Sequence, residues 1–386
     1  MTAKQWLQYI FTIVLSLAVL LGAYHYVQDL RAQTYLQADF VTMKGRVTEI
    51  ADVQEESFTL GDTTYTDRTI FFRVELLNEY REGEIITTQQ NLDPLLSYTT
   101  KEVEVGDLVM IYEYHNELGY SYAFGDYWRS DALIWLLVLF CGAVILFGRL
   151  KGLNTLLGLG ITCLFVFLVF VPSILAGQNI YVWSILTCLY SIVTTLLIVN
   201  GYDRKSYIAA AGCFGGVLIA GLLTAAMNAI MNITGLVDEQ AMYLNDLAGG
   251  LTIDLRAVIF AAIIIGATGA VMDVAISIAS SLYELNDQLE NPTFRTLLRS
   301  GFTIGRDMMG TMANTLVLAY IGSSLATVVL IVAYNASLTS IFNKEMIVVE
   351  VEQALVGSFG ILSAIPLTSL LAAWFYPLGR KKRSVQ

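Results

Sequence analysis

The stretch GATGAVMDVAISIASSLYEL, residues 266–285, places the carboxylate of Asp273 among residues typical of a lipid-buried helix. A charge at a bilayer centre costs roughly 2.5–3.5 kcal/mol, so such a group usually faces a cavity or a partner. Small or polar residues recur at steps of three or four around it and form one helical stripe: Gly266, Gly269, Ser277, Ser280 and Glu284. We expect this stripe to face the helix bundle. The opposite face, with Val271 and Ile278, would then meet lipid or neighbouring helices.

A second polar face follows in residues 306–325, where Asp307, Thr311 and Asn314 are spaced by four and three. If the two helices are antiparallel, Asp273 and Asn314 both lie about 12–16 Å from the cytoplasmic ends and can meet. Burial disfavours an ionised carboxylate, so Asp273 could load and release a proton. Asn314 and Thr311 would orient it, and Ser277 would share the proton or ion. The structural alternative is one interhelical hydrogen bond, worth about 0.6–2 kcal/mol.

Glycines suggest interruptions in these two helices. A helix from Asp254 to Glu284 would be about 45 Å long, against a hydrocarbon thickness of about 30 Å. The candidate breaks are Gly266, Gly269 and Gly322, and broken helices are a feature of transport sites. Alternatively, these glycines only let helices pack closely.

A further polar set is expected in the outer half of the membrane. Its members begin or end predicted helices, and they are Asn228, Asn232, Asp254, Arg256, Glu350 and Glu352. They could line an outer vestibule. The alternative is an ion pair between Arg256 and Glu350 or Glu352.

Several reaction classes lack their sequence motifs. There is no Walker A loop, HExxH, GxSxG or CxxC, so we expect no catalytic residues, no metal site and no cofactor. An intramembrane aspartyl protease using Asp273 and Asp307 is the weakest alternative, because Ala270-Val271-Met272 precedes Asp273 where such proteases have a GxGD stretch. The four cysteines all lie in apolar runs, so no disulfide framework is expected outside the membrane.

The elements that hold these residues are membrane helices. Of the 386 residues, 56% are apolar and 14% charged, which is typical of an integral membrane protein. Eight spans are predicted, at about 6–24, 131–148, 153–176, 180–199, 207–231, 252–283, 308–334 and 347–376. Lys and Arg gather in alternate loops and in the tail, so the positive-inside rule places both termini in the cytoplasm. The first span is predicted to be a retained signal anchor over 1–24, rather than a cleaved signal peptide.

Residues 25–129 have a different composition, with 19 acidic and 8 basic side chains. Alternating runs such as TIFFRVELL (69–77) predict about five strands, hence a small all-β, extracytoplasmic domain, an OB-like barrel on strand count alone. The acidic excess indicates a solvated surface or, alternatively, cation capture at Glu55-Glu56 or Glu82/Glu84. The absence of a basic surface argues against a nucleic-acid partner.

Three of these stretches together resemble the YibE/F family of bacterial multipass membrane proteins. They are GATGAVMDVAISIASSLYEL, GRDMMGTMANTLVLAYIGSSL and LVGSFGILSAIPLTSLLAA, in that order. The resemblance covers about residues 130–377, and the ectodomain is similar to that of the longer, YibE-type members. It implies the bacterial plasma membrane, the eight-helix plan and, as partner, a YibF-like sister chain or a second copy.

The sequence therefore predicts an α-helical integral membrane protein with an inserted β domain. Its parts would be the anchor, the ectodomain over 25–129, a seven-helix domain over 130–377 and a basic cytoplasmic tail over 378–386. We expect a secondary transporter or permease for an ion or small molecule. The alternative is a non-transporting receptor or assembly factor whose ectodomain binds a ligand or partner.

Overall fold

The computed structural model describes residues 3–31, 40–78, 81–93, 101–116, 119–245, 253–334 and 337–378. The chain divides into two compact units. One is helical and comprises residues 1–35 and 144–386, and the other comprises residues 36–143 and contains the strands. Most of the basic tail expected from residue 378 onward lies outside the described residues.

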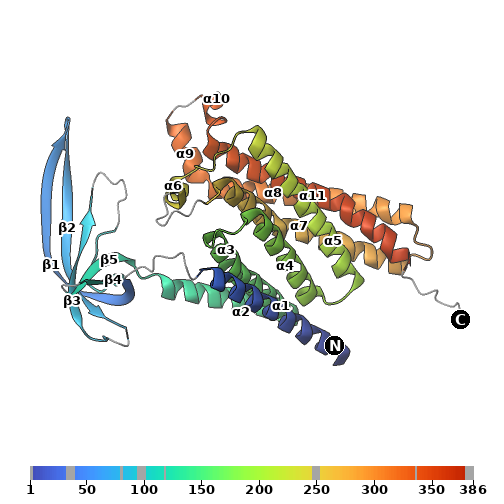
Figure 1. Cartoon of the computed structure of the whole chain (residues 1–386), viewed down its shortest axis with the longest axis horizontal. Coiled ribbons are helices and arrows are strands. Elements are labelled where there is room, and N and C mark those ends of the chain that lie inside the picture. The colour runs from blue at the N-terminus through green and yellow to red at the C-terminus, as the bar shows by residue number, and fades with distance from the viewer. Residues whose placement is uncertain are drawn as a thin grey trace. The chain divides into compact units, whose positions relative to one another are not determined.

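The helical unit begins with α1 (Ala3–Arg31) and continues after the strands with the part of α2 (Ser130–Phe165) from Val144 onward. A π-helical turn (Val166–Phe170) and α3 (Val171–Leu175) extend α2. The next helices are α4 (Ile180–Asn200), α5 (Arg204–Ile230), α6 (Glu239–Asn245), α7 (Leu255–Gln288) and α8 (Phe294–Ser323). The last three are α9 (Leu325–Ala333), α10 (Leu338–Ile341) and α11 (Glu345–Leu378). Figure 1 shows these helices with their labels.

The main core of this unit forms where α7 and α11 pack against each other and against α5 and α8 (Figure 1). Small residues allow close approach, as is usual for membrane helices, where apolar surface alone does not drive association. A Cβ added to Gly216 of α5 would lie 2.8 Å from the carbonyl oxygen of Gly360 in α11 and 3.1 Å from Cγ1 of Val271 in α7. The three helices therefore meet at glycine, and their spacing depends on it.

Six helical segments of the described chain are long and apolar enough to cross a membrane, and the eight predicted spans are not confirmed. The segments are Trp6–Leu30, Ser130–Leu175, Ile180–Asn200, Arg204–Ile230, Leu255–Gln288 and Glu345–Leu378. Two predicted spans, 131–148 and 153–176, fall in α2 and its extension, where non-helical backbone at Arg149 separates two helical parts. Arg149 has φ 49° and ψ −128°, and the carbonyl oxygen of Val144 would lie 2.2 Å from a Cβ on Gly152. Eight residues of straight helix span about 12 Å, so the chain bends sharply there.

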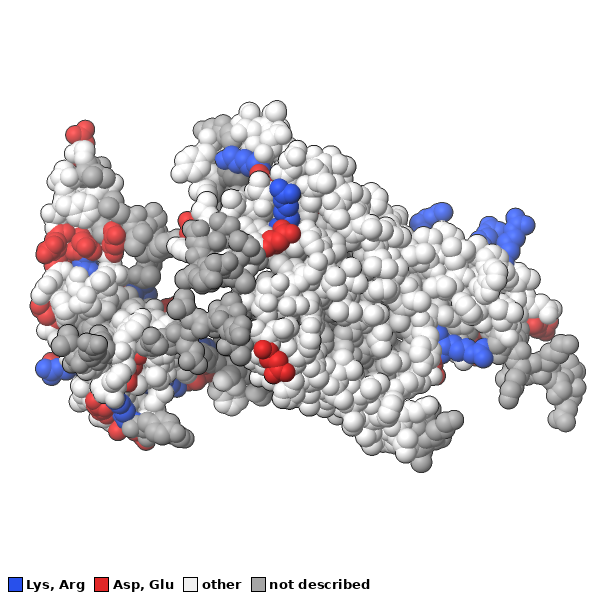
Figure 2. Space-filling model, viewed as in Figure 1, with Lys and Arg blue, Asp and Glu red and all other residues white. Residues whose placement is uncertain are grey.

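The other difference concerns residues 308–334, where the helix is divided at Ser324. The division leaves α8 with the charged and polar residues, while α9 is apolar but only 9 residues long. Neither piece alone resembles a membrane span. Charged side chains are nevertheless sparse over the middle of the helical unit in Figure 2, as expected for a membrane-embedded protein.

The second unit is a five-stranded antiparallel sheet in the order β3-β2-β1-β4-β5. The strands are β1 (Phe40–Leu60), β2 (Thr63–Leu76), β3 (Ile85–Leu92), β4 (Leu108–Asn116) and β5 (Gly119–Tyr127). The predicted alternation in β2 is confirmed, since Ile70, Phe72, Val74 and Leu76 are all buried in one apolar core. Register shifts in β1 at Val47/Glu49 and Ile50/Asp52 bend the strand.

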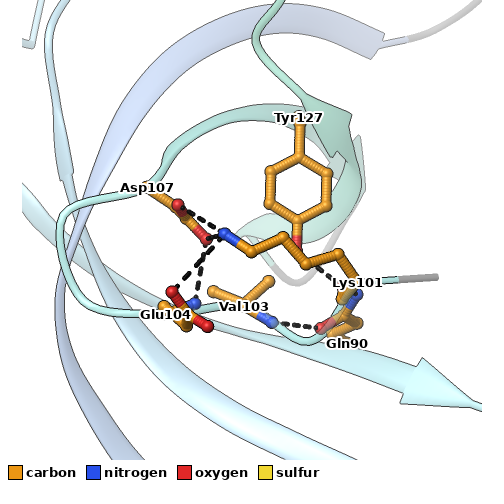
Figure 3. A network of polar contacts seen from close by, with 6 residues as sticks. All are labelled: Gln90, Lys101, Val103, Glu104, Asp107 and Tyr127. Atoms are coloured by element: carbon orange, nitrogen blue, oxygen red, sulfur yellow. Dashed lines mark hydrogen bonds and ion pairs between the residues drawn. The ribbon is translucent and has the colours of Figure 1, made fainter.

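The two edges of the sheet approach each other, because the Thr88 hydroxyl of β3 donates to the carbonyl oxygen of Tyr122 in β5 over 3.2 Å. At one point Lys101 connects the two edges, since it bonds to Gln90 of β3 and to Tyr127 of β5 (Figure 3). Val103 lies in the core, and its amide donates to Oε1 of Gln90 over 2.9 Å. The carbonyl oxygen of Lys101 accepts from Nε2 of Gln90 and from the Tyr127 hydroxyl. The sheet is therefore curled into a partly open barrel.

Candidate functional site

Asp273 lies in the middle of α7, and the stripe around it faces away from the main core of the bundle. Gly266, Gly269 and Asp273 are exposed and Ser277 is only partly buried, whereas Val271 and Ile278 are fully buried. The prediction that the polar face packs inward was therefore wrong. The reason is steric, since the inward face of α7 also carries Ala267, Ala275 and Ala279, which let α5 and α11 approach closely.

The polar residues of α8 occupy a similar position. Asp307, Thr311 and Asn314 are exposed, while methionines on the other face pack against the main core. The Thr311 hydroxyl donates to the carbonyl oxygen of Met308 in its own helix, over 2.9 Å. Within the described residues no hydrogen bond joins Asp273 to Asn314 or Thr311, so this chain alone does not form the pair.

The glycines behave differently in the two helices. α7 is continuous from Leu255 to Gln288, so the interruption expected at Gly266 and Gly269 is not present. A side chain on Gly266 would meet the Tyr320 hydroxyl of α8 at 3.0 Å, so this glycine serves helix contact. Near Gly322 the helix does divide, between Ser323 at the end of α8 and Leu325 at the start of α9.

The outer polar set is split between buried and exposed positions. Glu352 of α11 and Asn228 of α5 are each only 5% exposed. Arg256 is exposed, and among the described residues it forms no ion pair with Glu350 or Glu352, so the predicted pairing is not found. Burial of Glu352 between helices explains the difference, since it removes the carboxylate from the surface that Arg256 occupies.

The two remaining members of the set have local structural roles. Asp254 caps the start of α7 by accepting hydrogen bonds from the backbone amides of Arg256 and Ala257. Asn232 follows the end of α5 with φ 53°, a left-handed conformation that asparagine tolerates well.

One long-range contact of a charged side chain was missed by the sequence patterns. The Glu345 carboxylate, at the start of α11, accepts hydrogen bonds from the backbone amides of Thr234 at 2.7 Å and Gly235 at 2.6 Å. It also accepts from the Thr234 hydroxyl at 2.9 Å. This clasp ties the segment after α5 to α11. An acidic residue in the first turn of a helix was the only available signal, and it does not reveal a partner more than a hundred residues away.

Some acidic residues of the β unit form ion pairs with arginine. Glu55 lies 3.0 Å from Arg68, and Glu84 lies 3.8 Å from Arg81. No group of three or more metal-ligating side chains occurs among the described residues. A groove of about 660 Å³ lies between β3 and β5. These are the two edge strands of the sheet, and they do not form a ladder of backbone hydrogen bonds with each other. Its lining includes Thr87, Gln89, Asn91, Tyr122 and Phe124.

Comparison with known sequences decides the family. The profile of the YibE/F-like protein family matches residues 136–378, which is more than half of the chain. The chain belongs to the YibE/F family. Its YibE/F region includes most of α2 and all of α3 to α11, and therefore both polar sets. The β strands lie outside the region that defines the YibE/F match. No curated protein and no solved structure matches the chain.

Proposed function

We propose that this YibE/F chain is a secondary transporter or permease of the bacterial plasma membrane, with an intramembrane carboxylate pathway along α7. Both termini would lie in the cytoplasm and residues 25–129 outside. The observation that carries the proposal is Asp273, an exposed carboxylate in the middle of a membrane-spanning helix. Intramembrane carboxylates are rare because they are costly, and they commonly mark ion or substrate paths.

The exposure of Asp273 supports a pathway completed by a second chain. A stripe of glycine, serine and aspartate facing lipid would leave the carboxylate without water or a hydrogen-bond partner. The same small residues permit close contact with another helix. A second YibE/F chain, either a YibF-like sister or another copy, would cover the stripe. Crosslinking through a cysteine at Gly269 in native membranes should give a dimer, and monomer at every expression level would refute this partner.

The pathway is tested with Asp273→Asn, which keeps the size of the side chain but cannot titrate. Purified parent and variant are reconstituted in liposomes and screened for proton and ion flux. Asp273→Asn should insert and fold normally and lose its flux. Asp287→Asn is the matched control, because Asp287 is an exposed carboxylate at the end of the same helix. An Asp273→Asn protein as active as the control would refute the pathway.

A second function, as a receptor or assembly factor, is favoured by one observation in the β unit. The groove between β3 and β5 offers polar side chains and the open edges of two strands. Open strand edges bind extended segments by adding a strand. The two functions separate in the same liposomes, because a receptor gives no flux with either the parent or the variants.

A further inference from the structure

A second carboxylate lies deeper in the protein than Asp273, and the pathway does not use it. Glu352 of α11 is 95% buried, and neither of its oxygens has a hydrogen-bond partner in the described structure. No Lys or Arg of the described residues forms an ion pair with it. An isolated, desolvated carboxylate is one of the most costly groups a protein can bury. Some other species must therefore neutralise it.

The facing helix supplies one polar group at the same depth. α5 and α11 run antiparallel, with Gly212 against Thr368, Gly216 against Ala364, and Ala220 against Gly360. Each step of four residues along α5 corresponds to a step of four back along α11. Two further steps bring Asn228 opposite Glu352. Asn228 is also buried, and both polar atoms of its side-chain amide lack partners.

The space beside Glu352 restricts what can bind there. It borders a cavity of about 310 Å³ whose other lining side chains are all apolar, including Leu223, Met227, Phe342 and Val356. Ile259 and Ile263 of α7 pack in one apolar cluster with Val356. Two further titratable groups belong to this region, Glu350 of α11 and Tyr320 of α8, and they interact with each other. A metal ion such as Na⁺ needs several oxygen ligands, and the side chains of the described residues supply one carboxylate and one amide here.

We propose that Glu352 and Asn228 form a proton-binding site between the outer halves of α5 and α11. The proton comes from water and adds to one carboxylate oxygen of Glu352, which thereby becomes a neutral hydroxyl donor. The amide oxygen of Asn228 is the acceptor that α5 offers to it. This site rests on burial and register alone, and it holds whether or not the chain transports anything.

Dicyclohexylcarbodiimide tests the site because it reacts with protonated carboxyls in apolar surroundings. The acid O–H adds across one C=N bond to give an O-acylisourea, which rearranges to a stable N-acylurea with no leaving group. The full chain in lipid nanodiscs is treated over a series of pH values, and adducts are located by mass spectrometry. We expect an adduct on Glu352 that falls about tenfold for each pH unit above its midpoint, as for one titrating proton.

Three variants complete the experiment. Glu352→Gln should remove the adduct, and Glu350→Gln, two residues away on the same helix, should leave it unchanged. Asn228→Ala should move the midpoint to lower pH, because it removes the acceptor that stabilises the neutral acid. The pH series on the parent protein decides the question even if Glu352→Gln fails to fold. No adduct on Glu352 at any pH, an adduct independent of pH, or protection by Na⁺ at constant pH would each overturn the proposal. Asp273→Asn should not affect the adduct, which separates this site from the proposed pathway.

Discussion

Glu345→Ala should loosen the helical unit where the segment after α5 meets the start of α11. The Glu345 carboxylate accepts from the amides of Thr234 and Gly235 and from the Thr234 hydroxyl. A hydrogen bond to a charged group contributes about 1.5–3 kcal/mol when buried. Gly235 is buried but Thr234 is exposed, so water weakens the hydrogen bonds that Thr234 donates. We therefore expect less than the sum of three buried hydrogen bonds, a loss of about 2–4 kcal/mol of stability.

Glu345→Gln refines the test, because one amide oxygen remains to accept but the negative charge is lost. Its effect should be about half that of Glu345→Ala, since neutral hydrogen bonds are roughly half as strong as charge-assisted ones. Glu239→Ala is the control, because Glu239 is an exposed acidic residue at the start of α6 with no side-chain hydrogen bond in the described structure.

The assay is the apparent melting temperature of the purified chain in nanodiscs. For a chain of 386 residues 1 kcal/mol corresponds to about 1–2 °C, so Glu345→Ala should melt about 2–8 °C below the parent. Equal melting temperatures for Glu345→Ala and Glu239→Ala would refute the reasoning. A Gln variant less stable than the Ala variant would show that the charge is not the stabilising feature.

Two further outcomes are expected. In the β unit, desolvation raises the pKa of Asp107, but the Glu104 amide and the Lys101 ammonium outweigh it and hold that pKa below its ordinary value. This stabilisation is present at neutral pH and is lost as the pH falls through the lowered pKa, so Asp107→Asn should flatten the acid unfolding curve followed by limited proteolysis. In the helical unit, Gly212→Leu should cost about 1–3 kcal/mol, because a Cβ there would lie 2.0 Å from Oγ1 of Thr368. Gly160→Leu, which enters open space, should melt like the parent.

The sequence predicted the elements well where one face is buried and the other is not. In β2 the alternation of Ile70, Phe72, Val74 and Leu76 is a direct consequence of one buried face. The extension of β1 and β2 beyond this core was not predicted. Residues 51–59 of β1 are exposed on both faces, and this part of the strand pairs with β2 alone. No alternation of apolar and polar residues therefore appears in its sequence.

The candidate site was harder to predict than the helices that hold it. Periodicity correctly grouped Asp273 with Gly266 and Gly269 on one face, but it could not tell which face packs. In a membrane, close contact of small residues decides this, and the partners of α7 include Gly216 and Gly360, which lie far away in the sequence. The proposed placement of Asn228 opposite Glu352 likewise depends on the register between α5 and α11. The sequence of either helix alone does not determine that register.

The position of α11 has a consequence for how the chain is made. Among the described helices it comes last in the chain, yet it packs against α5, α7 and α8, and the buried Tyr376 hydroxyl donates to the carbonyl oxygen of Ala279, 97 residues earlier. Until its 34 residues are inserted, α5 and α7 lack one of the helices that they pack against. Translation that stalls before residue 345 therefore leaves an incomplete bundle, which membrane proteases and chaperones can distinguish from the finished protein.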